Sequence, residues 1–171
     1  MPLLFAGLLI ALLVAPASAE PPTGFAEFPW GTEPSVLRDR FLSKRCRSSS
    51  ESREPWYSIT CLGYLVEGLS VPVLRLDFEP GASLAGYYMV IAPGSYPALR
   101  DLVIKRFGRP TSRARVFWSG AHLSWAWPGM SATMIERCGE EASCLEVTTA
   151  PIERRREQLR ERERRDSAQS F

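Results

Sequence analysis

The clearest alternation of hydrophobic and polar positions in the chain lies at residues 95–110. Apolar side chains return there every three or four positions, which predicts a helix with one buried face. The apolar positions are Leu99, Leu102, Val103 and Phe107. Ser95 is placed to cap the first turn through its hydroxyl, and Gly108 followed by Pro110 predicts the end of the helix.

Short runs with a period of two flank this helix and predict strands. In residues 71–78 every second side chain is apolar, as in a strand with one buried face. We expect strands over residues 56–62, 71–78, 84–91, 115–119, 123–127, 131–137 and 144–149. The turn sequence at residues 79–83 predicts that the second and third strands form an antiparallel hairpin.

Three further segments complete the pattern. Residues 35–42 predict a short first helix, and residues 43–55, rich in Ser, Arg and Glu, predict a loop. Residues 153–166 alternate Arg and Glu around a single apolar residue, Leu159. We expect a charged tail there that is either disordered or a solvent-exposed helix with weak ion pairs, since nothing apolar would dock it.

These elements predict an α+β fold in two layers, with the helices packed on one face of an antiparallel sheet. A helix, a polar connector and a run of strands occur twice, which predicts two helix-plus-meander halves in tandem at residues 25–93 and 94–150. Both halves belong to a single expected domain of residues 20–152, followed by the charged tail at residues 153–171.

Two short motifs accompany this order of elements: W-G-x-x-x-S at residues 30–35, and F-G-R-P at residues 107–110 with a tryptophan-bearing strand after it. They look like a pattern seen in many uncharacterised secreted proteins. The order of elements resembles the tandem helix-plus-meander modules of small exported bacterial proteins, such as the β-lactamase inhibitor proteins and, more distantly, the small outer-membrane assembly lipoproteins. The chain lacks the lipid-attachment cysteine of the lipoproteins. The inhibitor-like resemblance implies a binding role.

The N-terminal segment carries a targeting pattern. Residues 2–15 are apolar and are followed by an A-x-A site at residues 17–19. We expect residues 1–19 to be a secretory signal peptide, with a mature chain that starts at Glu20 and is periplasmic or secreted. The alternative is an uncleaved membrane anchor, but the apolar run is shorter than the roughly 20 residues that span a bilayer.

The four cysteines, Cys46, Cys61, Cys138 and Cys144, all lie after this segment. An even number in an exported chain favours disulfides, and three pairings are possible. We favour Cys46 with Cys61 and Cys138 with Cys144, because each pair closes a short loop. A metal site of Cys138, Cys144 and His122 is the alternative, but it matches no common zinc spacing, and no C-x-x-C redox motif occurs.

Charge alternates in blocks along the chain. Residues 38–53 and 100–115 each carry six basic side chains, against two acidic ones in the first block and one in the second. The candidate binding residues among the arginines of the two helices and their connectors are Arg38, Arg100, Arg106 and Arg109. They would either meet an anionic partner or form an ordinary solvated face. Nucleic acid is a poor partner for the Arg-rich tail, because acidic residues interrupt its arginines.

No motif predicts catalysis. The segment from Ser119 to His122 lacks the G-x-S-x-G context of a nucleophile, and no glycine-rich phosphate loop follows a strand. The carboxylates Glu136, Glu140, Glu141 and Glu146 cluster around an expected hairpin tip, where solvated charge is usual. We therefore expect a chain that is not an enzyme and that uses no metal or cofactor.

The aromatic side chains give the stronger hypothesis. Trp118, Trp125, Trp127 and Tyr87 lie on expected strands and are either core or binding residues. Trp125 and Trp127 share one side of their strand, and we favour the core for this pair. The sequence thus predicts an exported binding protein whose partner is another exported or envelope protein. The alternatives are a binder of a small anionic or amphipathic ligand and an enzyme of unrecognised type.

Overall fold

The computed structural model describes residues 20–40, 46–50, 57–79, 81, 83–139 and 142–169. The side chains of residues 38–40, 48–50, 57 and 169 are outside this description. The expected signal peptide, residues 1–19, also lies outside the described residues, as does Trp56 at the start of the first expected strand.

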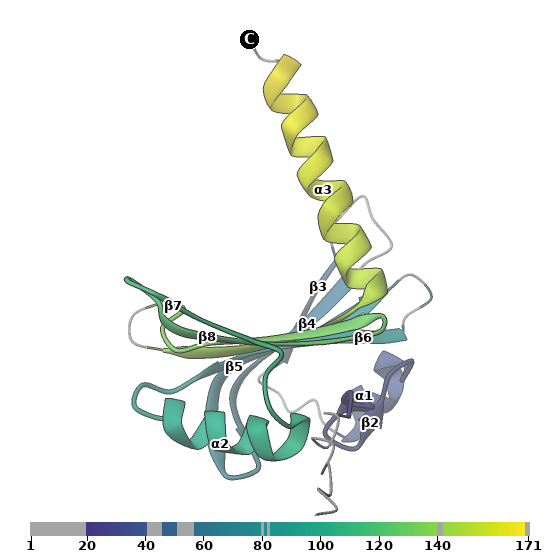
Figure 1. The fold of residues 1–171 in the computed structure, drawn as a ribbon. Helices are drawn as coiled ribbons and strands as arrows, with labels where there is room; N and C mark the ends of the chain where they lie inside the picture. Colours follow the sequence, from purple (N-terminus) through teal and green to yellow (C-terminus); the bar gives the residue numbers. More distant parts are fainter. Residues whose placement is uncertain are drawn as a thin grey trace, which may run out of the picture.

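Eight strands of the described chain form one antiparallel sheet (Figure 1). They are β3 (Cys46–Ser50), β4 (Tyr57–Val66), β5 (Leu69–Glu79), β6 (Ser83–Ile91), β7 (Ser112–Val116), β8 (Gly120–Trp127), β9 (Met130–Ile135) and β10 (Ser143–Thr149). Their order across the sheet is β3-β4-β5-β6-β10-β9-β8-β7. Strands β3 to β6 and strands β7 to β10 are thus two series, and they meet where β10 pairs with β6.

The expected fold class is wrong in its central point. The protein is mostly β, and it is not two helix-plus-meander halves in tandem, because six residue pairs join β6 to β10 in one continuous sheet. The helices do not share one face either: Figure 1 shows α1 and α2 below the sheet and α3 rising from the other side. Pairing β6 with β10 satisfies two strand edges that would otherwise present open backbone donors and acceptors.

Helix α2 (Tyr96–Phe107) covers one face of this sheet. Leu99, Val103 and Phe107 are its buried residues, as the sequence predicts, while Leu102 is only partly buried. The expected cap is wrong in one respect, since the Ser95 side chain makes no capping hydrogen bond. The C-terminal end is as expected: Gly108 has a φ of 75°, and its N–H donates to the Ile104 carbonyl at 2.9 Å.

The core lies between α2 and the sheet. Alternate residues of the three central strands point into it, so that their period of two matches the buried face. They include Leu74, Leu76 and Phe78 of β5, Tyr87 and Met89 of β6, and Leu145 and Val147 of β10. The residues between them point to the other face of the sheet, and many of these are polar.

An N-terminal segment covers the rest of the core face. It consists of a two-stranded ribbon, β1 (Gly24–Phe25) with β2 (Phe28–Pro29), followed by the short helix α1 (Pro34–Arg40). Phe25, Phe28 and Leu37 are its large buried side chains. The indole N–H of Trp30 donates to the Pro22 carbonyl at 2.7 Å and holds the start of the segment in place.

Helix α3 (Ala150–Gln169) begins on the opposite, polar face. Contrary to expectation, an apolar residue does dock it: Ile152 is buried where the helix crosses Gly86 of β6. Arg156 pairs with Glu146 of β10, its Nη1 donating to Oε2 at 3.1 Å. Beyond Arg156 the side chains are mostly exposed, with ion pairs such as Arg160 to Glu157 at 3.0 Å.

Both expected disulfides are present. Cys46 and Cys61 are register partners that tie the edge strand β3 to β4, and Cys138 is joined to Cys144 across the connection from β9 to β10. Strand β3 itself lies in residues 43–55, where the sequence predicts a loop. The expected strand at residues 115–119 is also wrong in its second half, because β7 ends at Val116 and residues 117–119 form a turn.

Candidate functional site

The turn between β7 and β8 presents two large aromatic side chains to solvent. Phe117 is 96% exposed and Trp118 is 79% exposed. The turn is short, because Val116 and Gly120 are already register partners. Gly120 has a φ of 73°, a left-handed conformation that glycine adopts without strain at the end of such a turn.

The backbone of this turn is held by the end of β9. The Ala121 N–H donates to the Glu136 carboxylate at 2.7 Å, and the Arg137 N–H donates to the Ser119 carbonyl at 2.9 Å. These bonds fix the backbone after the aromatic pair, and the pairing of Val116 with Gly120 fixes it before the pair, so the side chains project from a preorganised support. We call Phe117, Trp118 and this turn the aromatic tip.

Basic side chains accompany the aromatic tip. Residues 109–122 contain Arg109, Arg113 and Arg115 and no Asp or Glu. All three arginines are exposed, and β7 is an edge strand of the sheet. Arg113 and Arg115 are two residues apart on β7, so they lie on one side of it. The aromatic tip therefore has a positively charged flank.

The remaining exposed large hydrophobics do not form a comparable site. Among the described residues they are Leu65 at 72%, Leu62 at 53% and Val36 at 45%, and none of these is aromatic. Single exposed aliphatic residues are common on protein surfaces and need no function. Among the described residues, the aromatic tip is the place where two large aromatics stand adjacent and exposed.

The other candidate tryptophans belong to the core. Trp125 is 1% exposed, and its indole N–H donates to the Gly108 carbonyl at 3.0 Å. The Trp127 ring is partly buried and meets the Phe107 ring edge-on, with centroids 5.7 Å apart. The prediction that this pair faces inward is confirmed, and of the candidate tryptophans Trp118 is the one at the surface.

The structure does not gather the candidate arginines into one patch. Arg100 pairs with its neighbour Asp101 at 2.7 Å, and Arg106 pairs with Glu67 at 2.7 Å. Arg109 is exposed just beyond the end of α2, and the side chain of Arg38 lies outside the described residues. The expected basic surface along both helices, which would meet an anionic partner, therefore stays a prediction.

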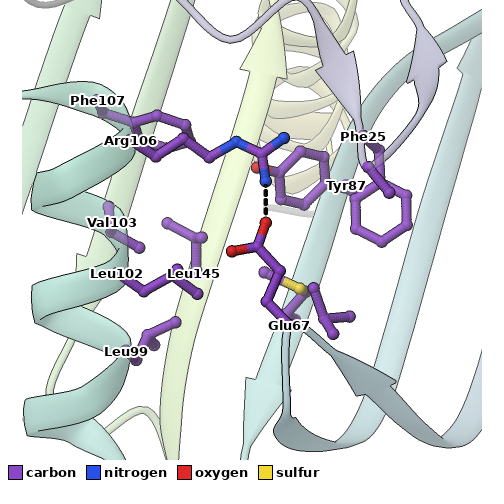
Figure 2. A pocket seen from close by; sticks show the side chains of 12 residues that line it. Phe25, Glu67, Tyr87, Leu99, Leu102, Val103, Arg106, Phe107 and Leu145 are labelled. Carbon is purple, nitrogen blue, oxygen red and sulfur yellow. Dashed lines mark hydrogen bonds and ion pairs between the residues drawn. The ribbon is translucent and has the colours of Figure 1, made fainter.

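Tyr87 and Arg106, both candidates from the sequence, do come together. They line a pocket between α2 and the sheet whose mouth carries Glu67 (Figure 2). Burial raises the pKa of the Tyr87 hydroxyl, and the opposing influence of Arg106 is smaller. The hydroxyl therefore stays protonated at neutral pH. Sequence reasoning missed Glu67, although Gly68 between two apolar runs indicates a short hairpin turn.

Sequence reasoning also missed Phe117, because it placed this residue inside a strand. The signal was available: Phe117 and Trp118 are adjacent, so a strand would put them on opposite faces, and the following Ser-Gly favours a turn.

One further arrangement at the tip has catalytic residue types. Ser119 Oγ lies 2.6 Å from His122 Nε2. A serine nucleophile also needs a group that orients the far side of the imidazole. The nearby Glu136 carboxylate accepts the Ala121 N–H, so it is engaged in holding the turn. The contact between Ser119 and His122 joins two residues at the end of the turn, and it does not by itself support an enzymatic proposal.

The described residues contain neither a metal-binding cluster nor a membrane-spanning helix. No group of three His, Cys, Asp or Glu side chains there could hold a metal ion. None of the helices in that part of the chain combines the length and the apolar character needed to cross a membrane.

Comparison with known proteins gave no relative. No family model matches the chain, and no curated protein and no solved structure is significantly similar to it. The resemblance to the β-lactamase inhibitor proteins stays a prediction.

Proposed function

We propose that this chain is an exported, non-catalytic binding protein that docks on another exported protein through the aromatic tip. The observation that carries the proposal is the adjacent exposure of Phe117 and Trp118 on a turn with a fixed backbone. The two disulfides are compatible with an oxidising, exported location.

The physical argument concerns the free energy of leaving two aromatic rings in water. Burial in a partner's pocket would remove from water most of the apolar area that the two rings now expose. Each Å² of apolar area buried in this way contributes about 25 cal/mol of favourable free energy. Tryptophan is among the residues most enriched in binding hot spots, since its ring buries a large area while few rotatable bonds are fixed. The hydrogen bonds that hold the turn lower the entropy lost on binding further.

The charges around the tip indicate the kind of partner. Arg113 and Arg115 of β7 would form part of the rim of the interface around an aromatic centre, whereas Arg109 lies beyond the far end of β7. A rim of this sign favours a partner surface that is acidic, because complementary charge raises the association rate. We therefore expect a protein pocket lined by apolar side chains and bordered by Asp or Glu.

The test compares three forms of the mature chain, residues 20–171, as bait for envelope and secreted proteins of the native host. They are the unchanged chain, Phe117→Ser with Trp118→Ser, and Leu62→Ser with Leu65→Ser. The last is a matched control, because it also removes two exposed hydrophobics at another place on the surface. Each captured partner is then titrated against all three forms.

We expect the tip variant to bind the partner more weakly, by about 2 kcal/mol or more of binding free energy, as at a hot spot. The control variant should bind as tightly as the unchanged chain. All three forms should melt at the same temperature, since none of the altered side chains is buried. Equal binding by the tip variant and the unchanged chain would contradict the proposal. If the unchanged chain bound vesicles of anionic lipid in the absence of a protein partner and the tip variant did not, the tip would be assigned to a membrane surface instead.

A further inference from the structure

We infer that an extended segment of the partner pairs with β7 as a further strand of the sheet and carries Asp or Glu opposite Arg113 and Arg115. The added strand would belong to the protein that receives the aromatic tip, so the inference rests on the proposed function. It specifies a second contact of the same interface and the chemistry of the partner segment that makes it.

Strand β7 is open along its outer side. It is the last strand of the sheet (Figure 1), and β8 is its pairing partner in the part of the chain that the structure describes. The side chains of residues 112–115 are all exposed. An edge strand of this kind presents a row of backbone donors and acceptors with which another chain can pair.

The hydrogen bonds of β8 show how its backbone is oriented. The Ala121 N–H donates to the Glu136 carboxylate at 2.7 Å, and the Ala121 carbonyl accepts from the Glu136 N–H at 2.9 Å, so the backbone of Ala121 points toward the end of β9. Backbone groups alternate between the two sides of a strand. The next residue, His122, therefore points toward β7, where its register partner is Ala114.

The backbone of β7 alternates in the same way. Because Ala114 faces β8, its neighbours Arg113 and Arg115 present their N–H and C=O groups to the open edge. A bond further along agrees with this orientation, since the Ala126 N–H donates to the Thr111 hydroxyl at 3.1 Å and so also points toward the β7 side. An added strand would form its backbone hydrogen bonds with the two arginine residues.

The side chains of the same two residues indicate the chemistry of the added strand. Arg113 is in register with Leu123 and Arg115 with Ala121, which places both arginines on the face of the sheet that α2 covers. Neither forms an ion pair with a described residue, and residues 109–122 contain no Asp or Glu. Opposite charges directly across two strands stabilise their pairing. Acidic side chains at alternate positions of the added strand would therefore meet both arginines.

The edge fits the partner of the tip better than it fits a second copy of this chain. In an antiparallel pair of two β7 strands, the arginines of both copies would lie opposite one another, and like charges destabilise such a pair. The edge also leads directly to the tip, because β7 ends at Val116 and Phe117 follows. A segment paired along β7 would thus end beside the aromatic pair, so one partner surface can contact both.

The test is an amide NMR titration of the mature chain with a capped peptide that alternates Glu with Val, and with the same peptide carrying Lys in place of Glu. Arg113→Gln with Arg115→Gln removes both charges. Arg113→Pro with Arg115→Gln also removes an outward N–H, a change that an edge strand tolerates. Lys105→Gln with Arg109→Gln is the matched control, because it removes two exposed basic side chains outside β7. The spectra also check that each variant retains the pairing of β7 with β8.

We expect the Glu peptide to shift the amide signals of β7 and to slow hydrogen exchange at Arg113 and Arg115, and the Lys peptide to do neither. Loss of both charges should weaken binding of the Glu peptide about fivefold, as for two cross-strand charge pairs. The proline variant should bind about fivefold more weakly again, as for one lost hydrogen bond. The control should bind like the unchanged chain. No shift of the β7 amides, or equal binding by the folded proline variant and its glutamine counterpart, would overturn the inference.

The tip variant, Phe117→Ser with Trp118→Ser, separates this inference from the proposed function. It leaves the edge of β7 intact, so it should bind the Glu peptide as the unchanged chain does. With the captured partner, we expect both the tip variant and the β7 variants to lose affinity. A loss in the tip variant alone would retain the proposed function and overturn the inference. A loss in the β7 variants alone would overturn the tip as the docking site and support strand addition at β7.

Discussion

Phe107 connects helix α2 to the tryptophans of the sheet. Its ring meets those of Trp125 and Trp127 edge-on, with centroids 6.0 and 5.7 Å away, and the side chain is fully buried. Edge-to-face pairs of this kind add to the hydrophobic gain of burial. Leu102, one turn earlier, is different, because it is partly exposed at the wall of the pocket.

We therefore expect Phe107→Ala to lower the free energy of unfolding by about 3–5 kcal/mol, through lost burial and the cavity left behind. Leu102→Ala should cost less than the roughly 2 kcal/mol at the low end for buried leucines, since solvent already reaches this side chain. Urea unfolding of both variants measures the difference. Equal losses in the two variants would show that the buried face of α2 is assigned wrongly.

Asp77 is the residue that should give the stability a particular dependence on pH. Burial raises the pKa of its carboxyl, while Arg75, with Nε 3.0 Å from Oδ1, lowers it in part. Arg156 and Glu146 have smaller, opposite influences on the same pKa. The folded state thus holds the Asp77 proton more tightly than the unfolded state, whose pKa is about 4.

The sign follows from this difference in proton binding. The stabilisation by protonated Asp77 is complete below the unfolded pKa, about 4, and is lost as the pH rises through the raised folded-state pKa. We therefore compare the free energies of unfolding of the unchanged chain and of Asp77→Asn. The difference, unchanged chain minus variant, should fall as the pH rises from about 4 through the folded-state pKa of Asp77. Urea unfolding of both forms at a series of pH values measures it. A difference that is constant with pH would contradict the raised pKa.

At the scale of elements, helix α3 divides into a docked and a free part. Ile152 is buried, Glu153 accepts a hydrogen bond from Thr148, and Arg156 pairs with Glu146. The helix approaches the sheet closely at Gly86, where a side chain would meet the Val147 carbonyl and Ile152. The later turns carry only exposed ion pairs such as Arg165 with Glu161, at 3.9 Å.

We expect Ile152→Ala to cost about 2 kcal/mol of unfolding free energy or more, as for a buried isoleucine. Removal of residues 158–171 should cost less than about 1 kcal/mol, because each exposed pair contributes only about 0.2–0.5 kcal/mol. Both forms are compared with the full mature chain in urea. A large loss on truncation would mean that the outer turns of α3 have a docking surface of their own.

At the scale of the whole molecule, the contact between β6 and β10 makes the sheet one unit. Six residue pairs cross this boundary, and the core side chains of β6 and β10 are continuous beneath it. Separation at residue 93 would expose a strand edge and half of a hydrophobic core on each side.

We therefore expect the fragments of residues 20–93 and 94–171 to be unfolded when each is expressed alone, with poorly dispersed amide NMR spectra. Mixed in equal amounts, they should associate and recover the spectrum of the intact chain, since the paired β6 and β10 restore the core. If either fragment alone gave a dispersed spectrum, the protein would consist of two independent folding units after all.

Local interactions let the sequence determine a good part of this protein. The helix at α2, its stop at Gly108, the hairpin of β5 and β6 and the inward side of Trp125 follow from spacing and turn residues. The two disulfides also close short loops along the chain. Of the candidate binding residues, Trp118 carries the proposed function.

Only the tertiary structure decided what depends on contacts between distant segments. The pairing of β10 with β6 joins strands that are more than fifty residues apart, and the sequence holds no local sign of it. The same holds for the pocket, where Glu67 and Arg106 come from separate elements. Phe117 is exposed because β7 stops at Val116, and α3 docks because Gly86 leaves room for Ile152. Periodicity reports which face of an element is apolar, but the partner that covers this face is selected by the fit of the whole chain.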